Sequence, residues 1–146
     1  MKDEMQNTSP RRVDSSLILH PSSFLRYWLP PLLWAALIFA ASSVRTPPKP
    51  PVMPGFPWDK LAHAIEYAVL GMLLYRAFAE LEQFSKLRAV LLGIVFATAY
   101  GFSDELHQFF VGRDCEAVDI LTDFAGAVVG TVVYMTLFTR SAHNQP

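Results

Sequence analysis

Cysteine is nearly absent from the chain, since Cys115 is the single one among 146 residues. One thiol excludes an intrachain disulfide and a paired-cysteine metal or redox site. Charge is also scarce, because Asp, Glu, Lys and Arg make up 17% of the residues, against about 25% in an average soluble chain. The formal net charge of −1 provides no broad basic surface, and no zinc-finger, helix-turn-helix or RNA-binding signature occurs. We therefore expect no nucleic-acid partner.

The motifs of several common enzyme classes are missing as well. The sequence has no Walker loop, no GxGxxG and no HExxH pattern. No serine or cysteine stands in a nucleophile elbow, and Ser103, beside Asp104, is the nearest candidate. Any chemistry must therefore come from a different arrangement of side chains.

Apolar residues are abundant, at 52% of the chain, with a mean hydropathy of +0.27. Four apolar stretches, residues 24–44, 61–79, 89–103 and 117–138, approach or reach the roughly 20 residues that cross the hydrocarbon of a bilayer. The third is short, and its helix is expected to continue through Phe110 until Gly112 ends it. The sequence thus predicts an all-α polytopic membrane protein, with four transmembrane helices in a membrane domain of residues 24–140.

Polar segments flank and separate the predicted spans. Residues 1–23 bury too little apolar surface to fold and are predicted to be a flexible cytoplasmic tail, with residues 141–146 as a second cytoplasmic tail. Residues 46–57 contain six prolines, which favour an extended connector. Small residues near Ser42 also fit a cleavable signal peptide, but three further spans favour an uncleaved first span.

Lysine and arginine determine the predicted orientation. Both tails and the polar turn of residues 80–88 share one side, which carries eight of these cations, while the loops of residues 45–60 and 104–116 share the other side, which carries four. The positive-inside rule then places both termini in the cytoplasm. The two loops and the polar ends of spans two to four are predicted to face outward.

Polar side chains concentrate at that outer end of the last three spans. A charged side chain costs about 2.5–3.5 kcal/mol at the centre of a span, so such residues normally face the bundle and find partners. We therefore predict one polar pocket that opens outward, with Lys60 and Arg113 at its rim. Helical spacing aligns Asp59, His63, Glu66 and Tyr67 on the second span, Tyr100, Asp104 and Gln108 on the third, with Glu105 and His107 nearby, and Asp119 and Asp123 on the fourth.

Nine residues of this region are the candidate site. The predicted catalytic residues are His63, Asp104, Glu105 and Asp119, and the predicted substrate-binding residues are Lys60, Tyr67, Gln108, Arg113 and Asp123.

Two chemistries fit these residues. In one, His63 is a general base oriented by Asp59 or a neighbouring carboxylate, while Lys60 and Arg113 hold a phosphate or carboxylate of an amphipathic substrate. In the other, His63 ligates a divalent metal ion together with the acidic catalytic candidates. No cofactor is evident from the sequence, which does not decide between these chemistries or whether the chain is an enzyme.

A structural reading competes with both chemistries, because charges near a span end reach water and buried charges can form networks that only fix packing. Asp59 would then be the N-cap of the second span. Gly126 and Gly130 form a GxxxG step that lets another helix approach closely, so an oligomer through these glycines is a further expectation. Under this reading the chain is a non-catalytic membrane scaffold or interaction protein.

Two motifs in this region resemble those of the VanZ-like family of bacterial membrane proteins, named for a protein linked to teicoplanin resistance. The resemblance covers roughly residues 26–138. The chain departs from the family pattern where Val111 precedes Gly112 without the proline of many members, and where Ala64 replaces a common aromatic residue. The motifs are Asp59-Lys60-x-x-His63-x-x-x-Tyr67-x-x-Leu70-Gly71 and Tyr100-Gly101-x-x-Asp104-Glu105-x-x-Gln108-x-Phe110, the latter continuing through Gly112-Arg113 to Asp119, Asp123 and Gly126.

The resemblance implies a multi-pass protein of the bacterial cytoplasmic (inner) membrane, surrounded by membrane lipids, with a role in cell-envelope or glycopeptide-related biology. It implies no settled activity. A glycopeptide phenotype would fit a pocket that meets wall precursors or their lipid carriers at the outer face. We therefore expect the predicted pocket to bind or modify an anionic amphipathic envelope molecule.

Overall fold

A computed structural model of the chain describes residues 21–45, 55–81, 84–113 and 116–138. Across these residues the chain forms helices and no strands: α1 (Pro21–Ser42), α2 (Trp58–Arg76), the π-helical turn η2 (Ala77–Leu81), α3 (Lys86–Val111) and α4 (Ala117–Phe138). The predicted all-α fold is confirmed. Residues 1–20 and 141–146 of the predicted tails lie outside the described residues, as do residues 46–54 of the predicted connector, whereas residues 21–23 already belong to α1.

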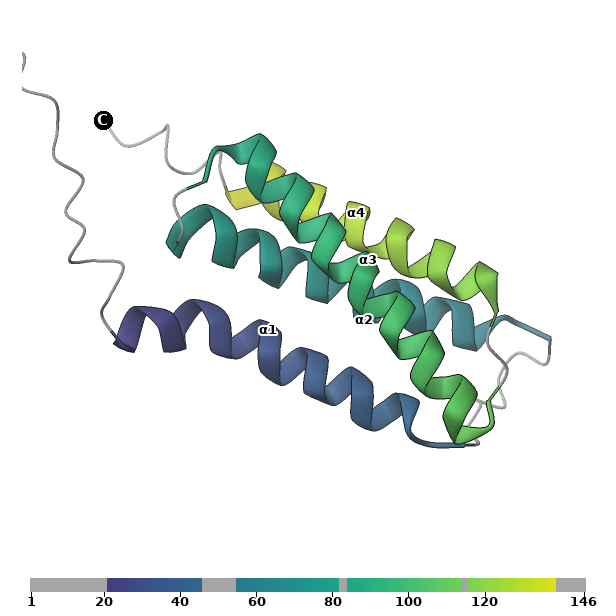
Figure 1. The fold of residues 1–146 in the computed structure, drawn as a ribbon. Helices are drawn as coiled ribbons and strands as arrows, with labels where there is room; N and C mark the ends of the chain where they lie inside the picture. The colour runs from purple at the N-terminus through teal and green to yellow at the C-terminus, as the bar shows by residue number, and fades with distance from the viewer. Residues whose placement is uncertain (1–20, 46–54, 82–83, 114–115, 139–146) are drawn as a thin grey trace, which may run out of the picture.

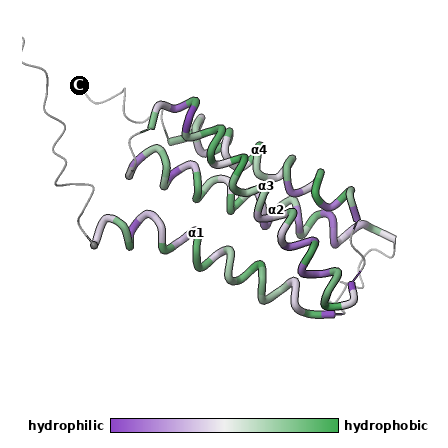
Figure 2. Tube along the Cα trace, viewed as in Figure 1, coloured by the Kyte–Doolittle hydropathy of each residue, from purple (hydrophilic) through white to green (hydrophobic). Residues whose placement is uncertain are grey.

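Four helices are long and apolar enough to cross a membrane: Ser22–Ser42, Trp58–Glu80, Lys86–Val111 and Ala117–Phe138. Figure 2 shows apolar colouring along much of each helix, with hydrophilic positions more frequent near the helix ends. The predicted four-span membrane protein is therefore confirmed.

α3 extends beyond the predicted span of residues 89–103 and ends at Gly112. Gly112 has a φ of 86°, and its N–H donates to the carbonyl groups of Gln108 and Phe109. Glycine adopts this left-handed conformation without strain because it has no Cβ atom, so it ends the helix as its position predicted. The extension holds the polar residues that follow the apolar stretch on a rigid helix.

The helices alternate in direction, so the chain returns twice to the same end of the bundle (Figure 1). α2 packs against α1, α3 and α4, and α3 also packs against α4. The C-terminal ends of α1 and α3 meet the N-terminal ends of α2 and α4 at one end (Figure 1). We call this the polar end (residues 42–45, 58–67, 101–113 and 116–126) and the opposite one the aromatic end (residues 24–28, 75–81, 84–90 and 134–138).

α2 and α4 approach closely at two glycines. A Cβ atom on Gly126 would meet the backbone of Ala64, and one on Gly130 would meet the backbone of Ala68. The close approach predicted for this GxxxG step therefore occurs within the chain. Both glycines are buried against α2, so an oligomer formed through them would have to displace α2.

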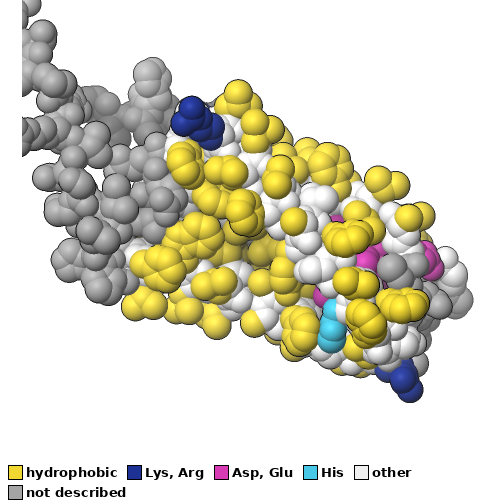
Figure 3. Space-filling view, in the orientation of Figure 1, with side chains coloured by type: hydrophobic (Ala, Val, Ile, Leu, Met, Phe, Trp, Pro, Cys, Tyr) yellow, Lys and Arg dark blue, Asp and Glu magenta, His cyan; other side chains and the backbone are white. Residues whose placement is uncertain are grey.

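The interior is apolar and aromatic, and so is the outside. Large apolar side chains cover much of the visible surface (Figure 3). Soluble monomers rarely expose a continuous apolar surface of this kind, so lipid is the fitting solvent for the outer faces. Buried core residues include Ile38, Tyr67, Leu70, Leu74, Tyr75 and Phe78. Exposed residues include Leu33, Ile65, Phe102 and Leu121.

Candidate functional site

Six polar side chains from α2, α3 and α4 are buried at the polar end, and we call them the buried polar cluster. Each is 5% exposed or less: His63, Asp104, Glu105, Gln108, Asp119 and Asp123. The acidic and histidine side chains visible in Figure 3 lie toward the same end of the molecule. The alternating topology thus brings together residues from three helices that the sequence placed at corresponding span ends.

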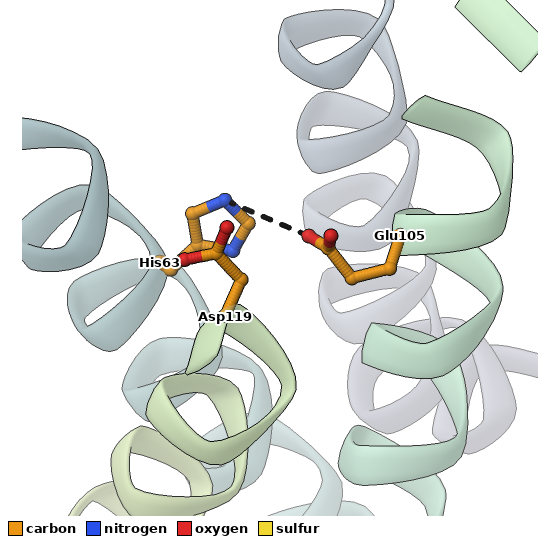
Figure 4. A group of neighbouring side chains, drawn as sticks. All are labelled: His63, Glu105 and Asp119. Carbon is orange, nitrogen blue, oxygen red and sulfur yellow. Dashed lines mark ion pairs between the residues drawn. The ribbon is translucent and has the colours of Figure 1, made fainter. Parts of the chain in front are cut away.

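His63 links α2 to α4. Its Nδ1 lies 2.9 Å from Asp123 Oδ1. An ionised carboxylate only accepts hydrogen bonds, so Nδ1–H is the donor, and the Nε2 of the neutral ring keeps a free lone pair. Nε2 lies 4.0 Å from Oε1 of Glu105 on α3 (Figure 4). Tyr67 is fully buried one turn further along α2, with its ring parallel to that of His63 and the ring centroids 6.4 Å apart.

The role predicted for Asp59 as the cap of α2 is wrong. The N-cap position is Pro57, which makes no side-chain cap hydrogen bond, and Asp59 already lies in the first turn. A residue inside the helix cannot take the non-helical backbone conformation of an N-cap. Asp59 instead lies 3.3 Å from Lys60 Nζ. The carboxylate that orients His63 is therefore Asp123, the neighbouring-carboxylate alternative.

Lys60 lies at the edge of the cluster. Its Nζ contacts Asp119 Oδ1 and lies 2.8 Å from Glu116 Oε2, in addition to its contact with Asp59. The Lys60 side chain is 23% exposed, so it reaches from the buried polar cluster toward the surface. The cation predicted for the rim is therefore already engaged by three carboxylates of the chain.

α1 contributes Ser42, which was not among the site residues predicted from the sequence. Ser42 Oγ donates to Asp104 Oδ2 over 2.8 Å, and Gln108 Nε2 donates to the same oxygen over 2.9 Å. Ser42 is itself buried. Its position at the end of the first span was a signal, because that end must lie beside the polar ends of the other spans. A single serine in an apolar run, however, forms no spaced pattern with other polar residues that would predict a site residue.

Several carboxylate oxygens of the cluster are incompletely paired. Besides Asp119 Oδ1, which faces Lys60, three have no hydrogen-bond partner among the described residues: Asp104 Oδ1, Glu105 Oε1 and Asp123 Oδ2. The other oxygen of Glu105 accepts from the backbone N–H of Glu116 over 3.3 Å. Leaving a buried polar group unpaired costs about 1–3 kcal/mol, and more for a charged group. The cluster is therefore not a closed hydrogen-bond network.

Two further candidates, Arg113 and His107, lie beside the cluster. The half-buried Arg113 follows the α3 C-cap, and its backbone N–H donates to the Gln108 carbonyl. His107 stacks on Phe39 of α1 with ring centroids 4.2 Å apart, and its Nε2 lies 3.0 Å from Ser43 Oγ. His107 therefore belongs to the α1–α3 contact rather than to the buried polar cluster.

Four apolar helices with a buried histidine and carboxylates at one end define a polytopic membrane protein with a polar centre built from three helix ends. A family model described as VanZ/LLP1 matches residues 2–139. The chain therefore belongs to the VanZ/LLP1 family, and the resemblance found in its motifs is confirmed. Comparisons with curated proteins and with solved structures found no match.

Proposed function

We propose that the buried polar cluster binds the head group of an anionic amphipathic envelope molecule, a wall precursor or its lipid carrier. The binding site opens to the outer face of the bacterial cytoplasmic membrane, and both termini are cytoplasmic, as the lysine and arginine distribution favours. The observation that carries the proposal is the set of buried carboxylate oxygens without a hydrogen-bond partner among the described residues. Such acceptors need a hydrogen-bond donor or a cation, which a hydroxyl of the head group or a bound cation would supply, and packing supplies neither.

An amphipathic ligand fits the surroundings of the cluster. Exposed apolar side chains lie on the same helix turns as the buried polar ones, including Ile65 on α2, Phe102 and Leu106 on α3, and Leu121 on α4. A lipid tail can lie along these faces in the bilayer while its head group reaches the end of the bundle. A fully water-soluble ligand would gain nothing from the apolar faces.

Charge places a condition on an anionic head group. Carboxylates outnumber cations at the polar end, and Lys60 is already shared by Asp59, Glu116 and Asp119. An anion next to buried carboxylates is repelled unless a cation lies between them. The head group is therefore expected to meet Arg113 and Lys60 at the rim, or a bound cation.

The His63–Asp123 pair extends the proposal from binding to modification. A histidine whose Nδ1–H is held by a carboxylate presents Nε2 as a general base, because the pairing fixes the tautomer and stabilises the protonated ring. Nε2 would take a proton from water or from a hydroxyl of the head group. The residues thus support proton-transfer chemistry on the bound molecule.

Binding in nanodiscs tests the proposal. The probes are a polyprenyl phosphate and the corresponding uncharged polyprenol, and the expected result is saturable binding of the phosphate alone. Gln108→Ala, in the cluster, should weaken binding at least about tenfold, or about 1.4 kcal/mol. Glu80→Gln, at the aromatic end, is the control and should not change it. Equal binding of the two lipids, or no effect of Gln108→Ala, would contradict the proposal.

A cellular test addresses the envelope role. Deletion of the gene should change the response to teicoplanin or the pool of wall precursors. An unchanged response together with an unchanged pool would remove the envelope part of the proposal.

A scaffold without catalysis is the second candidate, and a specific observation favours it. Two buried contacts join helices that are distant in sequence: Ser42 of α1 with Asp104 of α3, and His63 of α2 with Asp123 of α4. Such contacts can serve to fix helix pairing. The two candidates differ in what neutralising a cluster carboxylate does to stability, because a scaffold needs the charge and a ligand site does not.

A further inference from the structure

We infer that His63, Glu105 and Asp119 form a binding site for a divalent first-row transition-metal ion, such as Zn²⁺ or Mn²⁺. Each residue offers one ligand atom, and these atoms all lie within 4.8 Å of one another. The three side chains come from α2, α3 and α4 and converge on one point (Figure 4). All three are buried.

The spacing is close to that of a metal site. Ligand atoms about 2.1 Å from a tetrahedral Zn²⁺ lie about 3.4 Å from each other. His63 Nε2 and Glu105 Oε1 are 4.0 Å apart, which is too long for a hydrogen bond and slightly long for two ligands of one ion. A bound ion would have to draw the ligand atoms together from at most 4.8 Å to about 3.4 Å.

The surroundings of His63 match those of a metal ligand. Metal-bound histidines almost always donate their other ring N–H to a carboxylate or carbonyl, which fixes the tautomer and raises the basicity of the ligand nitrogen. Asp123 accepts from Nδ1 of His63 in this way, over 2.9 Å. Asp123 is 0% exposed, so the pair is held inside the bundle. Asp123 is therefore a positioning residue for the site.

Glu105 supplies an independent indication of a ligand. The residue is 1% exposed, and its Oε1 has no hydrogen-bond partner among the described residues. That oxygen points toward His63 (Figure 4). A metal ion between the two would satisfy both the buried oxygen and the free lone pair of the imidazole. Among the described residues, the 4.0 Å contact with His63 is the ion pair of this carboxylate, and it requires a protonated ring, whereas a metal ion would pair the oxygen with a neutral ring.

The ligand set indicates the class of ion. One imidazole nitrogen and two carboxylates suit Zn²⁺, Mn²⁺ or Fe²⁺, whereas Ca²⁺ and Mg²⁺ prefer oxygen alone and Cu⁺ prefers sulfur. Three protein ligands leave at least one position open, as in metal sites that bind substrate. Lys60 contacts Asp119 at Oδ1, and a carboxylate has acceptor sites for both a lysine and an ion.

The inference does not rest on the proposed lipid binding. An ion bound to Nε2 would take the lone pair that His63 needs as a general base, so the metal site replaces that role. The ion would also meet the charge condition for an anionic head group. A divalent ion would supply the positive charge that an anionic head group requires beside these carboxylates. An open coordination position would also give a phosphate oxygen a direct ligand contact.

Titration with Co²⁺ tests the inference on the full chain, purified in detergent and stripped with a chelator. Bound Co²⁺ has visible absorption that reports its coordination, so no activity is needed. We expect saturable binding of a single ion per chain. Asp123→Asn, which changes a residue that only positions His63, should weaken Co²⁺ binding by about 10–100-fold. His63→Gln and Glu105→Gln, which each remove a ligand, should weaken Co²⁺ binding more than Asp123→Asn does.

Folding is checked for every variant by its melting temperature and elution profile, and Glu80→Gln is the matched acidic control. No saturable binding by the folded parent would overturn the inference, as would binding that folded His63→Gln and Glu105→Gln leave unchanged. Polyprenyl phosphate is absent from this titration. Metal binding without lipid binding would therefore support the metal site and contradict the proposed function. Lipid binding without metal binding would support the proposed function and overturn the metal site.

Discussion

The two ends of the bundle hold their polar side chains in different ways. At the aromatic end, the Tyr134 hydroxyl donates to Glu80 over 3.0 Å in an exposed pair, and Arg76 lies 5.0 Å from the ring centroid of Tyr27. Aromatic rings fill the space between helices there, as in the edge contact of Trp28 with Phe78. These residues suit a membrane interface, where polar tips reach water and apolar parts stay in lipid.

At the polar end the arrangement is the reverse. The His63 ring and the carboxylates of Glu105 and Asp123 are buried, and carboxylate oxygens remain without a hydrogen-bond partner among the described residues. The exposed pair of Tyr134 with Glu80 costs little. The buried Tyr75 hydroxyl at the aromatic end also has no hydrogen-bond partner among the described residues, but it is uncharged, whereas the buried carboxylates of the polar end are far more expensive to leave unpaired. Simple anchoring at the interface therefore accounts for the exposed groups of the aromatic end but not for the buried carboxylates of the polar end, where a ligand is the better explanation.

The largest predicted effect is that of His63→Ala. The substitution removes the donor to Asp123 Oδ1, and leaving a buried charged group unpaired costs more than the about 1–3 kcal/mol lost at a neutral group. Tyr134→Phe, which removes an exposed hydrogen bond at the aromatic end, should cost no more than about 1.5 kcal/mol. Denaturant unfolding in micelles measures both. Equal losses would erase the distinction between the two ends.

Gly130→Ala is predicted to have the next largest effect. The new Cβ atom would collide with the carbonyl oxygen of Ala68, so α2 and α4 must move apart. Overpacking of this kind costs about 1–3 kcal/mol. Val129→Ala, on the lipid-facing side of α4, is the control and should change the melting temperature little. A Gly130→Ala protein as stable as the parent would mean that close packing does not set the pairing of His63 with Asp123.

Ser42→Ala should have a smaller effect. It removes one of two donors to Asp104. The expected loss is about 1.5 kcal/mol, the low end for hydrogen bonds to charged groups, because Gln108 still donates. Ser43→Ala, next along α1 and exposed, should cost less. Thermal unfolding of the two variants side by side measures the difference. The opposite ranking would show that α1 is held at the polar end by Ser43 and His107 instead.

The smallest effect is predicted for Glu80→Gln at the aromatic end. The amide oxygen still accepts from Tyr134, and the site is exposed, so stability should stay within about 0.5 kcal/mol of the parent. The melting temperature checks this result. A large loss here would mean that the aromatic end also depends on a charged pair.

Hydropathy was sufficient to predict the helices, because spans are recognised by length and apolar content alone. The meeting of three polar span ends followed from the alternating topology. Gly112 was a reliable helix end, since its left-handed backbone conformation favours glycine.

The pairing inside the cluster could not be predicted. Whether His63 meets Asp59 or Asp123 depends on how α2 and α4 are rotated about their axes, and the close contact at Gly126 and Gly130 sets that rotation. Ser42 was missed for a related reason, because its role depends on which face of α1 turns toward α3. The spacing of residues along one helix does not specify how that helix is rotated about its axis relative to its neighbours.

The melting temperature of metal-free Glu105→Gln decides whether the buried polar cluster is a ligand site or a structural ion network. Glutamine keeps an acceptor for the Glu116 N–H, and it removes a buried charge whose Oε1 has no hydrogen-bond partner among the described residues. If the cluster is a ligand site, the variant melts at or above the parent, because repulsion among the carboxylates falls. If the cluster is instead a structural ion network, the variant loses about 3–5 kcal/mol and melts far below the parent. A loss of that size would rule out a ligand site as the reason for the buried carboxylates.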